Sequence, residues 1–297
     1  MNEWVHRRGT LTDGGWQTVV DDRVPGWRHT GLRVAEFGDG EARRLEAADV
    51  ERLVVPLTGP VEVTYAEPGD DGVTVVLAGR ASVFDGPADV LYLGAGTSAE
   101  LRGTGRVAVA EAPTGERLPA VLTRAGDVAV ELRGHGRNSR QVHNFGTPDQ
   151  LRASRFMVVE VITPAGNWSS FPPHKHDTAV PGTELPLEEI YYLETAVSRG
   201  LSAPPEADPI GYMRTYTSDA GEIDTLAEVR TGDVVLVPHG YHGPCIAVPG
   251  YDLYFLNVMA GPEPERAWRL RDDPAHAWIA ATLAHEPIDP RLPYERP

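Results

Sequence analysis

Short runs of β-branched and aromatic residues, separated by glycine and proline, dominate the chain. Such runs between turn residues are typical of β-strands. In the first half they cover residues 52–57, 61–65, 73–77, 90–93, 106–110 and 128–132. In the second half they cover residues 155–163, 188–193, 211–217, 234–237 and 253–259. The pattern predicts an all-β protein, built as a sandwich or as barrels.

Helical periodicity is nearly absent. The one candidate helix covers residues 274–285, where Asp272 or Asp273 would cap the N-terminus and Pro274 would occupy the first turn. We therefore expect a short helix and a tail after the last strand.

A weak internal repeat relates the two halves of the chain. Residues 89–98 align without a gap with residues 233–242, and residues 50–55 align with residues 187–192, at similar offsets of 144 and 137 residues. A repeat of this length predicts two β-barrels in tandem. We expect an N-terminal barrel over residues 1–140, a C-terminal barrel over residues 141–272, and a helix and tail over residues 273–297.

The charge of the chain changes the range of partners to consider. It has 27 basic and 43 acidic residues, a net charge of −16, which disfavours binding to nucleic acid and to anionic membranes. Cys245 is the single cysteine, so no intramolecular disulfide forms. No apolar run reaches the length of a membrane span, and the first residues do not resemble a secretory signal, so we expect a cytoplasmic location.

His174 and His176 form an H-x-H pair that suggests metal binding. On an extended strand, alternate residues point to the same face, so both imidazoles can reach one ion. Two exposed histidines on a strand edge would give the same pattern. The pair alone therefore leaves both interpretations open.

Two further segments add candidate ligands. Glu188 and Glu189 begin a predicted strand, where an inward carboxylate needs a cation or hydrogen-bond donors. Because they alternate, at most one of them can be a ligand. His239 and His242 follow the apolar strand at residues 234–237, and one of them can complete the site. Nitrogen and oxygen donors of this kind bind Zn²⁺, Mn²⁺ or Fe²⁺ with open positions for a substrate.

These segments resemble a known family. The H-x-H and glutamate block, followed by G-D-x-x-x-x-P-x-x-x-H at residues 232–242, is similar to the two cupin motifs. More specifically, residues 163–177, 187–192 and 249–261 resemble the 5-deoxy-glucuronate isomerase family of myo-inositol catabolism, in the cupin superfamily.

The resemblance implies a fold, an activity and a metal site. It implies two tandem cupin barrels, of which the first lacks metal, since Arg52 aligns with Glu189 and Ser98 with His242. It implies a metal-dependent aldose–ketose isomerase that converts 5-deoxy-glucuronate to 5-dehydro-2-deoxygluconate. The implied cofactor is a divalent metal ion, Zn or Mn. Its ligands would be His174, His176, Glu189 and His242, and Glu188 remains an alternative to Glu189.

Isomerisation moves a proton between adjacent carbons, so it needs a base. The candidates are Glu160, His239 and the glutamate that does not bind the metal. The uronate substrate carries a carboxylate, so it also needs a cationic side chain. The candidate substrate-binding residues are Arg155, Lys175, Arg214 and Tyr251. Lys175 alternates away from the histidine face, so a structural salt bridge is an equally good interpretation for it.

Other functions fit the same residues. The alternatives are another cupin uronate isomerase, an oxygen-dependent dioxygenase, and a sugar-binding cupin without catalysis. In each case we expect a small-molecule ligand and neither nucleic acid nor a membrane as partner. A homo-oligomer is expected, because barrel edges are protected by pairing.

Overall fold

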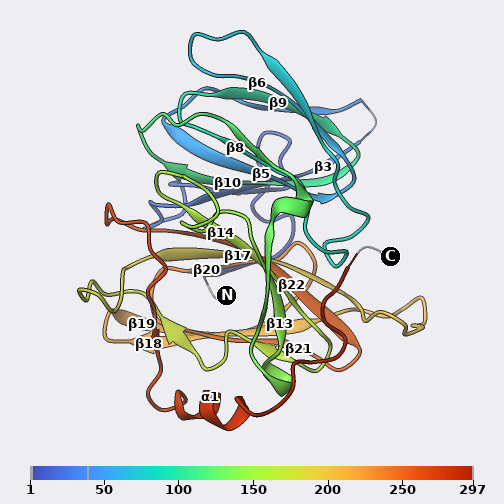
Figure 1. The fold of residues 1–297 in the computed structure, drawn as a ribbon, viewed down its shortest axis with the longest axis vertical. Coiled ribbons are helices and arrows are strands. Elements are labelled where there is room, and N and C mark those ends of the chain that lie inside the picture. The colour runs from blue at the N-terminus through green and yellow to red at the C-terminus, as the bar shows by residue number, and fades with distance from the viewer. Residues whose placement is uncertain (1–2, 39, 296–297) are drawn as a thin grey trace.

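The chain forms two stacked β-barrels, seen one above the other in Figure 1. The computed structural model describes residues 3–38 and 40–295. Each barrel consists of two antiparallel sheets packed face to face. The all-β class and the tandem arrangement expected from the sequence are confirmed.

The first barrel has a six-stranded and a four-stranded sheet. The six-stranded sheet has the order β11-β8-β5-β10-β3-β2, and the four-stranded sheet has the order β4-β9-β6-β7. Their bounds are β2 Thr18–Val20, β3 Gly31–Phe37, β4 Ala42–Leu45, β5 Val50–Thr58, β6 Val61–Ala66, β7 Val73–Leu77, β8 Val90–Leu93, β9 Ser98–Gly103, β10 Gly105–Pro113 and β11 Val121–Thr123.

The second barrel has a seven-stranded sheet, β1-β20-β17-β22-β14-β13-β12, and a sheet of order β19-β18-β21-β16-β23, in which β15 also pairs with β21. The bounds are β1 Val5–His6, β12 Ala129–Arg133, β13 Arg140–Asn144, β14 Met157–Thr163, β15 Trp168–Ser169, β16 His174–Lys175, β17 Glu188–Val197, β18 Gly211–Ser218, β19 Gly221–Val229, β20 Val234–Val237, β21 Tyr241–Ala247, β22 Tyr251–Ala260 and β23 Arg271–Asp272.

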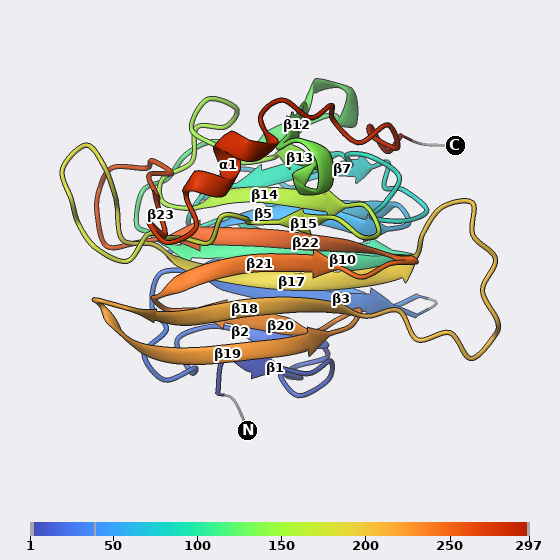
Figure 2. The ribbon, with the colours of Figure 1, turned by 90° about the horizontal axis from the view of Figure 1, so that it is seen from below.

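Among the residues that the structure describes, helical structure is confined to three short segments. Two 3₁₀ turns, η1 Ala125–Asp127 and η2 Gly136–Asn138, flank β12. The α-helix α1, Trp278–Leu283, lies outside the second barrel on the side away from the first (Figures 1 and 2). It is shorter than the predicted helix because residues 274–277 form turns, with Ala275 N donating to Asp273 Oδ1. None of the helices in residues 3–38 and 40–295 has the length and apolar character needed to cross a membrane.

Every predicted strand overlaps an observed strand. Among the strands that were missed, β19 alternates exposed polar and buried apolar residues, since Ile223 and Ala227 are buried and Glu222 is exposed. One face of such a strand meets solvent, so its apolar run is interrupted at every second position.

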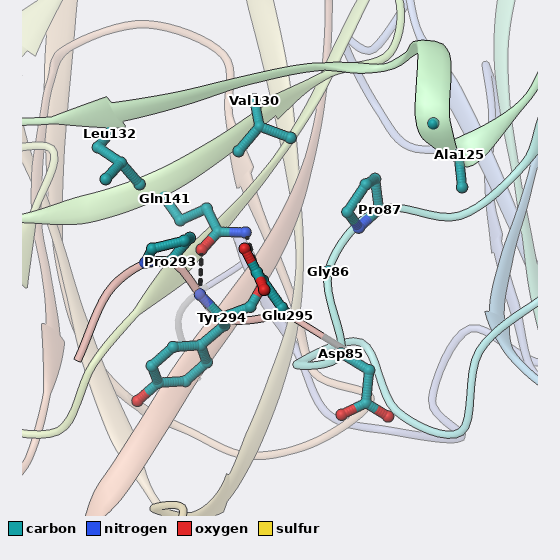
Figure 3. A pocket seen from close by; sticks show the side chains of 11 residues that line it. Asp85, Gly86, Pro87, Ala125, Val130, Leu132, Gln141, Pro293, Tyr294 and Glu295 are labelled. Atoms are coloured by element: carbon teal, nitrogen blue, oxygen red, sulfur yellow. Dashed lines mark hydrogen bonds between the residues drawn. The ribbon is translucent and has the colours of Figure 1, made fainter. Parts of the chain in front are cut away.

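The first and last strands of the seven-stranded sheet both come from residues before 141. At one edge β1 pairs with β20, and at the other β12 pairs with β13. The C-terminal segment also contacts both barrels. Tyr294 exchanges two hydrogen bonds with Gln141, at 2.6 and 3.0 Å, beside Gly86 and Pro87 of the first barrel (Figure 3). The division of the chain at residue 140 stays a prediction.

The six-stranded and seven-stranded sheets pack against each other and form a core between the barrels. Within it, Glu160 of β14 is fully buried and receives two hydrogen bonds of 2.6 Å from Arg80 of the first barrel. His143 and Tyr254 also contact its carboxylate, at 2.5 and 2.7 Å. Burial alone would raise the pKa of Glu160, but the Arg80 charge and hydrogen bonds lower it to about 2. Glu160 is therefore ionised, and its ion pair with Arg80 links the second barrel to the first.

Candidate metal centre and its cavity

Three histidines from the inner face of the second barrel converge. His174 of β16 and His242 of β21 are register partners in adjacent strands, and His176 follows β16 directly. Their ligand nitrogens all lie within 4.8 Å of one another. The ring centroid of His242 lies 4.5 Å from that of His174 and 4.6 Å from that of His176. The group has the residue types and the spacing that a divalent metal needs.

Glu189 approaches this group from β17 in the opposite sheet. Its Oε2 lies 3.1 Å from Nε2 of His176 and 3.2 Å from Nε2 of His242. Glu188, the alternative candidate, points the other way. Its Oε1 accepts hydrogen bonds from the backbone nitrogens of His29 and Thr30, at 2.5 and 2.6 Å. The structure thus brings Glu189, and not Glu188, to the histidines.

The hydrogen bonds of the imidazoles show that this group fits a cation. His176 Nδ1 faces Leu187 O at 3.0 Å, and His242 Nδ1 faces Gly240 O at 3.1 Å. Carbonyl oxygens only accept, so both Nδ1 atoms donate, and in neutral rings both Nε2 atoms carry lone pairs. These lone pairs face the Glu189 carboxylate, and His242 Nε2 has no hydrogen-bond partner. A divalent cation between these atoms would satisfy every one of them.

Burial and mutual charge set the protonation of these groups. Burial and the neighbouring His242 and His176 hold the pKa of His174 well below its usual value. Burial would raise the pKa of Glu189, but the neighbouring imidazoles of His176 and His242 lower it below its usual range. A charged carboxylate beside a neutral imidazole is the state in which both can bind a metal.

A network of charges fixes the loop between β16 and β17. Lys175 points away from the cluster and donates to Asp177 Oδ1 at 2.5 Å and to Glu184 Oε1 at 2.8 Å. Glu184 also accepts from the backbone nitrogen of Thr178 at 3.0 Å. Lys175 therefore makes the structural salt bridge that was one of its two interpretations. Through this salt bridge it fixes the backbone of its two neighbours in sequence, His174 and His176.

A cavity of about 170 Å³ opens beside the cluster, in the interior of the second barrel. It is lined by side chains from both sheets, which are Arg133, Arg140, Val142, Val161, Ser169, Ser170, Phe171, Pro172, His174, Glu189, Tyr191, Phe255, Asn257, Trp268, Leu270 and Asp272. Burial raises the pKa of Tyr191 well above its usual value and raises that of Asp272.

A larger pocket of about 610 Å³, drawn in Figure 3, includes the acidic residues Asp85 and Glu295 and none of the histidines.

The structure brings neither Glu160 nor His239, two of the candidate bases, to the cluster. Glu160 lies in the core between the barrels, because on β14 it alternates with Val159 and Val161, which face the cavity side. His239 lies against β19, where its Nε2 is 3.3 Å from Glu222 O, and it is outside the histidine group. Neither side chain lines the cavity.

Three candidate substrate-binding residues also lie outside the cavity lining. Arg155 reaches the backbone oxygens of Glu263 and Pro262, at 3.4 Å. Arg214 points outward from β18 and pairs with Asp224. Tyr251 begins β22 and is absent from the lining. The position of Arg214 follows from alternation along β18, whereas Arg155 precedes β14 and Tyr251 begins β22.

The cavity contains polar residues that the sequence interpretation missed. Arg133 and Arg140 lie at the ends of β12 and β13, and Asn257 and Trp268 face the same space. The only signal for Arg140 is its alternation with Val142, which becomes visible once residues 140–144 are recognised as a strand. This short segment is mostly polar, so it resembles a linker between barrels.

Comparison with known proteins assigns the chain to a family. The model of the KduI/IolB family matches residues 4–279. The chain belongs to the KduI/IolB family. Two relatives in it are named 5-deoxy-glucuronate isomerase. The protein of Geobacillus thermodenitrificans is 38% identical over 284 residues, covering 94% of this chain and 96% of its own. That of Halalkalibacterium halodurans is 42% identical over 256 residues, covering 84% and 88%.

Solved structures agree with the KduI/IolB assignment. An IolB-like protein from Salmonella typhimurium LT2 is 37% identical, with a TM-score of 0.81, and the match covers 93% of this chain and 98% of that one. Oxalate decarboxylase from Lactobacillus farciminis, in its formate complex, is 10% identical, with a TM-score of 0.63 and coverage of 95% and 91%. The second likeness concerns the tandem cupin fold alone.

Proposed function

We propose that this protein is a metal-dependent 5-deoxy-glucuronate isomerase, which converts 5-deoxy-glucuronate to 5-dehydro-2-deoxygluconate. The observation that carries the proposal is the set of three histidines and one glutamate beside a cavity of the second barrel. The names of the KduI/IolB relatives over most of the chain supply the reaction. A cytoplasmic location and a homo-oligomeric state are part of the same proposal.

His174, His176, Glu189 and His242 would hold the metal, which we propose to be Zn²⁺ or Mn²⁺, in agreement with three nitrogen donors and one oxygen donor. When bound, such an ion supplies a Lewis acid that stabilises negative charge on the sugar oxygens. The backbone carbonyls of Leu187 and Gly240 keep the imidazoles in the required tautomer. Apolar walls, including Val142 and Phe255, limit the entry of water.

Removal of the metal tests the proposal. Dialysis against a chelator is expected to lower the rate of aldehyde loss from 5-deoxy-glucuronate by at least about 100-fold, because the charge that develops on the sugar is no longer stabilised. Addition of Zn²⁺ or Mn²⁺ should restore the rate. The measurement is metal analysis of the purified protein combined with an NMR assay of substrate and product.

The same assay separates the other functions. Turnover in D₂O should place deuterium at the carbon beside the carbonyl, which a sugar-binding protein without catalysis would not do. Oxygen should not be consumed, whereas a dioxygenase would consume it. Full activity in a metal-free sample would contradict the proposed mechanism.

We further propose Asp272 for the proton transfer between the two carbons. It is the one carboxylate in the cavity lining apart from Glu189, and it is the register partner of His174. Tyr191, buried beside the cluster, stays protonated and orients a sugar oxygen by hydrogen bonding.

Replacing Asp272 with asparagine is expected to lower kcat about 100- to 10,000-fold while metal content is unchanged, because a positioned base contributes that much to the rate. Asp273→Asn provides the matched control. Asp273 is the adjacent residue, accepts from Tyr216 Oη and Ala275 N, and does not line the cavity. If both variants kept the wild-type kcat, the assignment of Asp272 would be incorrect.

A further inference from the structure

We propose that Arg140, together with Arg133, forms a subsite that binds the carboxylate of the substrate in the cavity beside the histidines. Both arginines line the cavity that also contains His174 and Glu189. The inference rests on the proposed function only for the identity of the substrate. The subsite itself is argued from the contacts and charges of the cavity.

The two arginines oppose each other across neighbouring strands. Arg133 of β12 and Arg140 of β13 are direct register partners in the antiparallel pair. Like charges at such positions repel and destabilise a sheet, so the pair costs folding free energy unless an anion lies between or beside them. A carboxylate that accepts from both guanidinium groups would remove this cost.

Arg140 differs from three other arginines in the interior of the protein. Arg52, Arg80 and Arg106 each form an ion pair with a buried glutamate, at 2.9, 2.6 and 2.6 Å. The Arg140 guanidinium donates to Asn138 O at 3.1 Å, and no carboxylate in the described part of the chain forms an ion pair with it. An inner arginine in a cavity with an unused fork of donors is suited to an anionic ligand.

Arg133 is fixed in a way that supports this use. Its Nε donates to Glu131 at 2.6 Å, and its guanidinium lies 5.2 Å from the centroid of the Trp268 ring. These contacts hold Arg133 at the edge of the cavity and neutralise part of its charge. Arg140 therefore provides most of the local positive charge, and Arg133 provides a second donor group.

Two unpartnered donors extend the subsite into the cavity. Asn257 Nδ2 and Trp268 Nε1 are buried, and neither has a hydrogen-bond partner. Both residues line the same cavity as the arginines. Buried donors without partners are rare in folded proteins, so their presence indicates a ligand rich in oxygen acceptors. A sugar acid has hydroxyl and carboxylate oxygens along its whole length.

The other cationic pocket does not share these features. A pocket of about 560 Å³ in the first barrel is lined by Arg28, Arg33 and Arg52. Arg33 and Arg52 both pair with Glu111, at 3.0 and 2.9 Å, and the carboxylates of Asp21 and Asp22 also line this pocket. Carboxylates of the protein itself therefore balance most of its positive charge. With a net charge of −16, the chain repels anions in general, so an arginine without an ion pair in this cavity provides a local attraction for an anionic ligand.

The test compares Arg140→Gln with Arg140→Lys and with the control Arg155→Gln. Arg155 is a partly exposed arginine outside the cavity lining, and the substitution leaves its backbone hydrogen bond to Glu51 intact. Arg140→Gln is expected to raise KM for 5-deoxy-glucuronate about 10- to 100-fold, because a charge-assisted hydrogen bond is lost. Arg140→Lys should lie between this variant and wild type, and Arg155→Gln should match wild type. Metal content and circular dichroism confirm that each variant is folded.

A binding measurement separates this inference from the proposed function. Calorimetric titration with 5-deoxy-glucuronate and with its neutral analogue, 5-deoxy-glucose, needs no turnover. Wild type should prefer the acid by at least about tenfold, and Arg140→Gln should bind both compounds equally. If wild type bound the acid in this way without isomerising it, the proposed function would fail and the subsite would stand. If Arg140→Gln kept the preference for the acid, the subsite proposal would be overturned.

Discussion

Replacing Glu189 with glutamine is expected to lower kcat/KM about 100- to 1,000-fold and to reduce the metal content of the purified protein. The reason is that an amide oxygen is a much weaker ligand than a carboxylate, and that the negative charge next to His176 and His242 is lost. The measurement combines isomerase kinetics with metal analysis at several added metal concentrations. Excess metal should recover part of the activity.

Glu188→Gln is the matched control, since it makes the same chemical change one residue earlier. Glu188 faces the first barrel and accepts hydrogen bonds from backbone nitrogens of residues 28–30, so its loss should leave metal content and kcat close to wild type. The opposite result, with an active Glu189→Gln and an inactive Glu188→Gln, would show that the wrong glutamate has been placed at the metal.

The largest effect on stability is expected at the junction of the barrels. Arg80→Met leaves Glu160 as a buried carboxylate without its cation, which should lower the free energy of unfolding by about 3–5 kcal/mol. Urea denaturation followed by tryptophan fluorescence measures the difference. The exposed pair of Arg44 and Glu100 provides the control, and Arg44→Met should cost less than about 1 kcal/mol.

The pH dependence of this difference has a defined sign. The pKa of Glu160 is about 2 in the folded protein and 4.5 at its ordinary value, so its ion pair contributes fully above pH 4.5. That contribution is lost as the pH falls through the folded pKa. The gap between wild type and Arg80→Met should therefore narrow from pH 4.5 toward pH 2. A gap below about 1 kcal/mol at pH 7 would mean that the buried pair does not stabilise the junction.

Strand periodicity predicted part of the candidate site. It places the imidazoles of an H-x-H pair on one face of an extended segment and restricts a Glu-Glu pair to one inward member. It left open which glutamate and which of His239 and His242 belong to the site, and the family resemblance supplied Glu189 and His242. The structure places these two residues together with His174 and His176. The apolar runs also predicted the strands that form the cores, because their residues are buried on both faces.

The remaining errors have a physical cause. On β14 every residue is buried, so its hydrophobic pattern does not distinguish the side facing the cavity from the side facing the other barrel. For that reason Glu160 was a reasonable candidate base on sequence grounds, although it belongs to the junction. Arg140 was missed because its strand, β13, is mostly polar in sequence. The strand pairs with β12 and β14, and Val142 is its only aliphatic residue, so the sequence shows little hydrophobic periodicity there.

The origin of the two edge strands β1 and β12 determines how the molecule can be divided. Both edges of the sheet that carries Glu189 are supplied by residues before 141. A fragment that begins at residue 141 would lack both of them and would expose unpaired backbone along β20 and β13, the condition that promotes aggregation. The catalytic half of the chain therefore depends on its neighbour for a closed surface, which ties loss of structure in one half to loss of activity in the other.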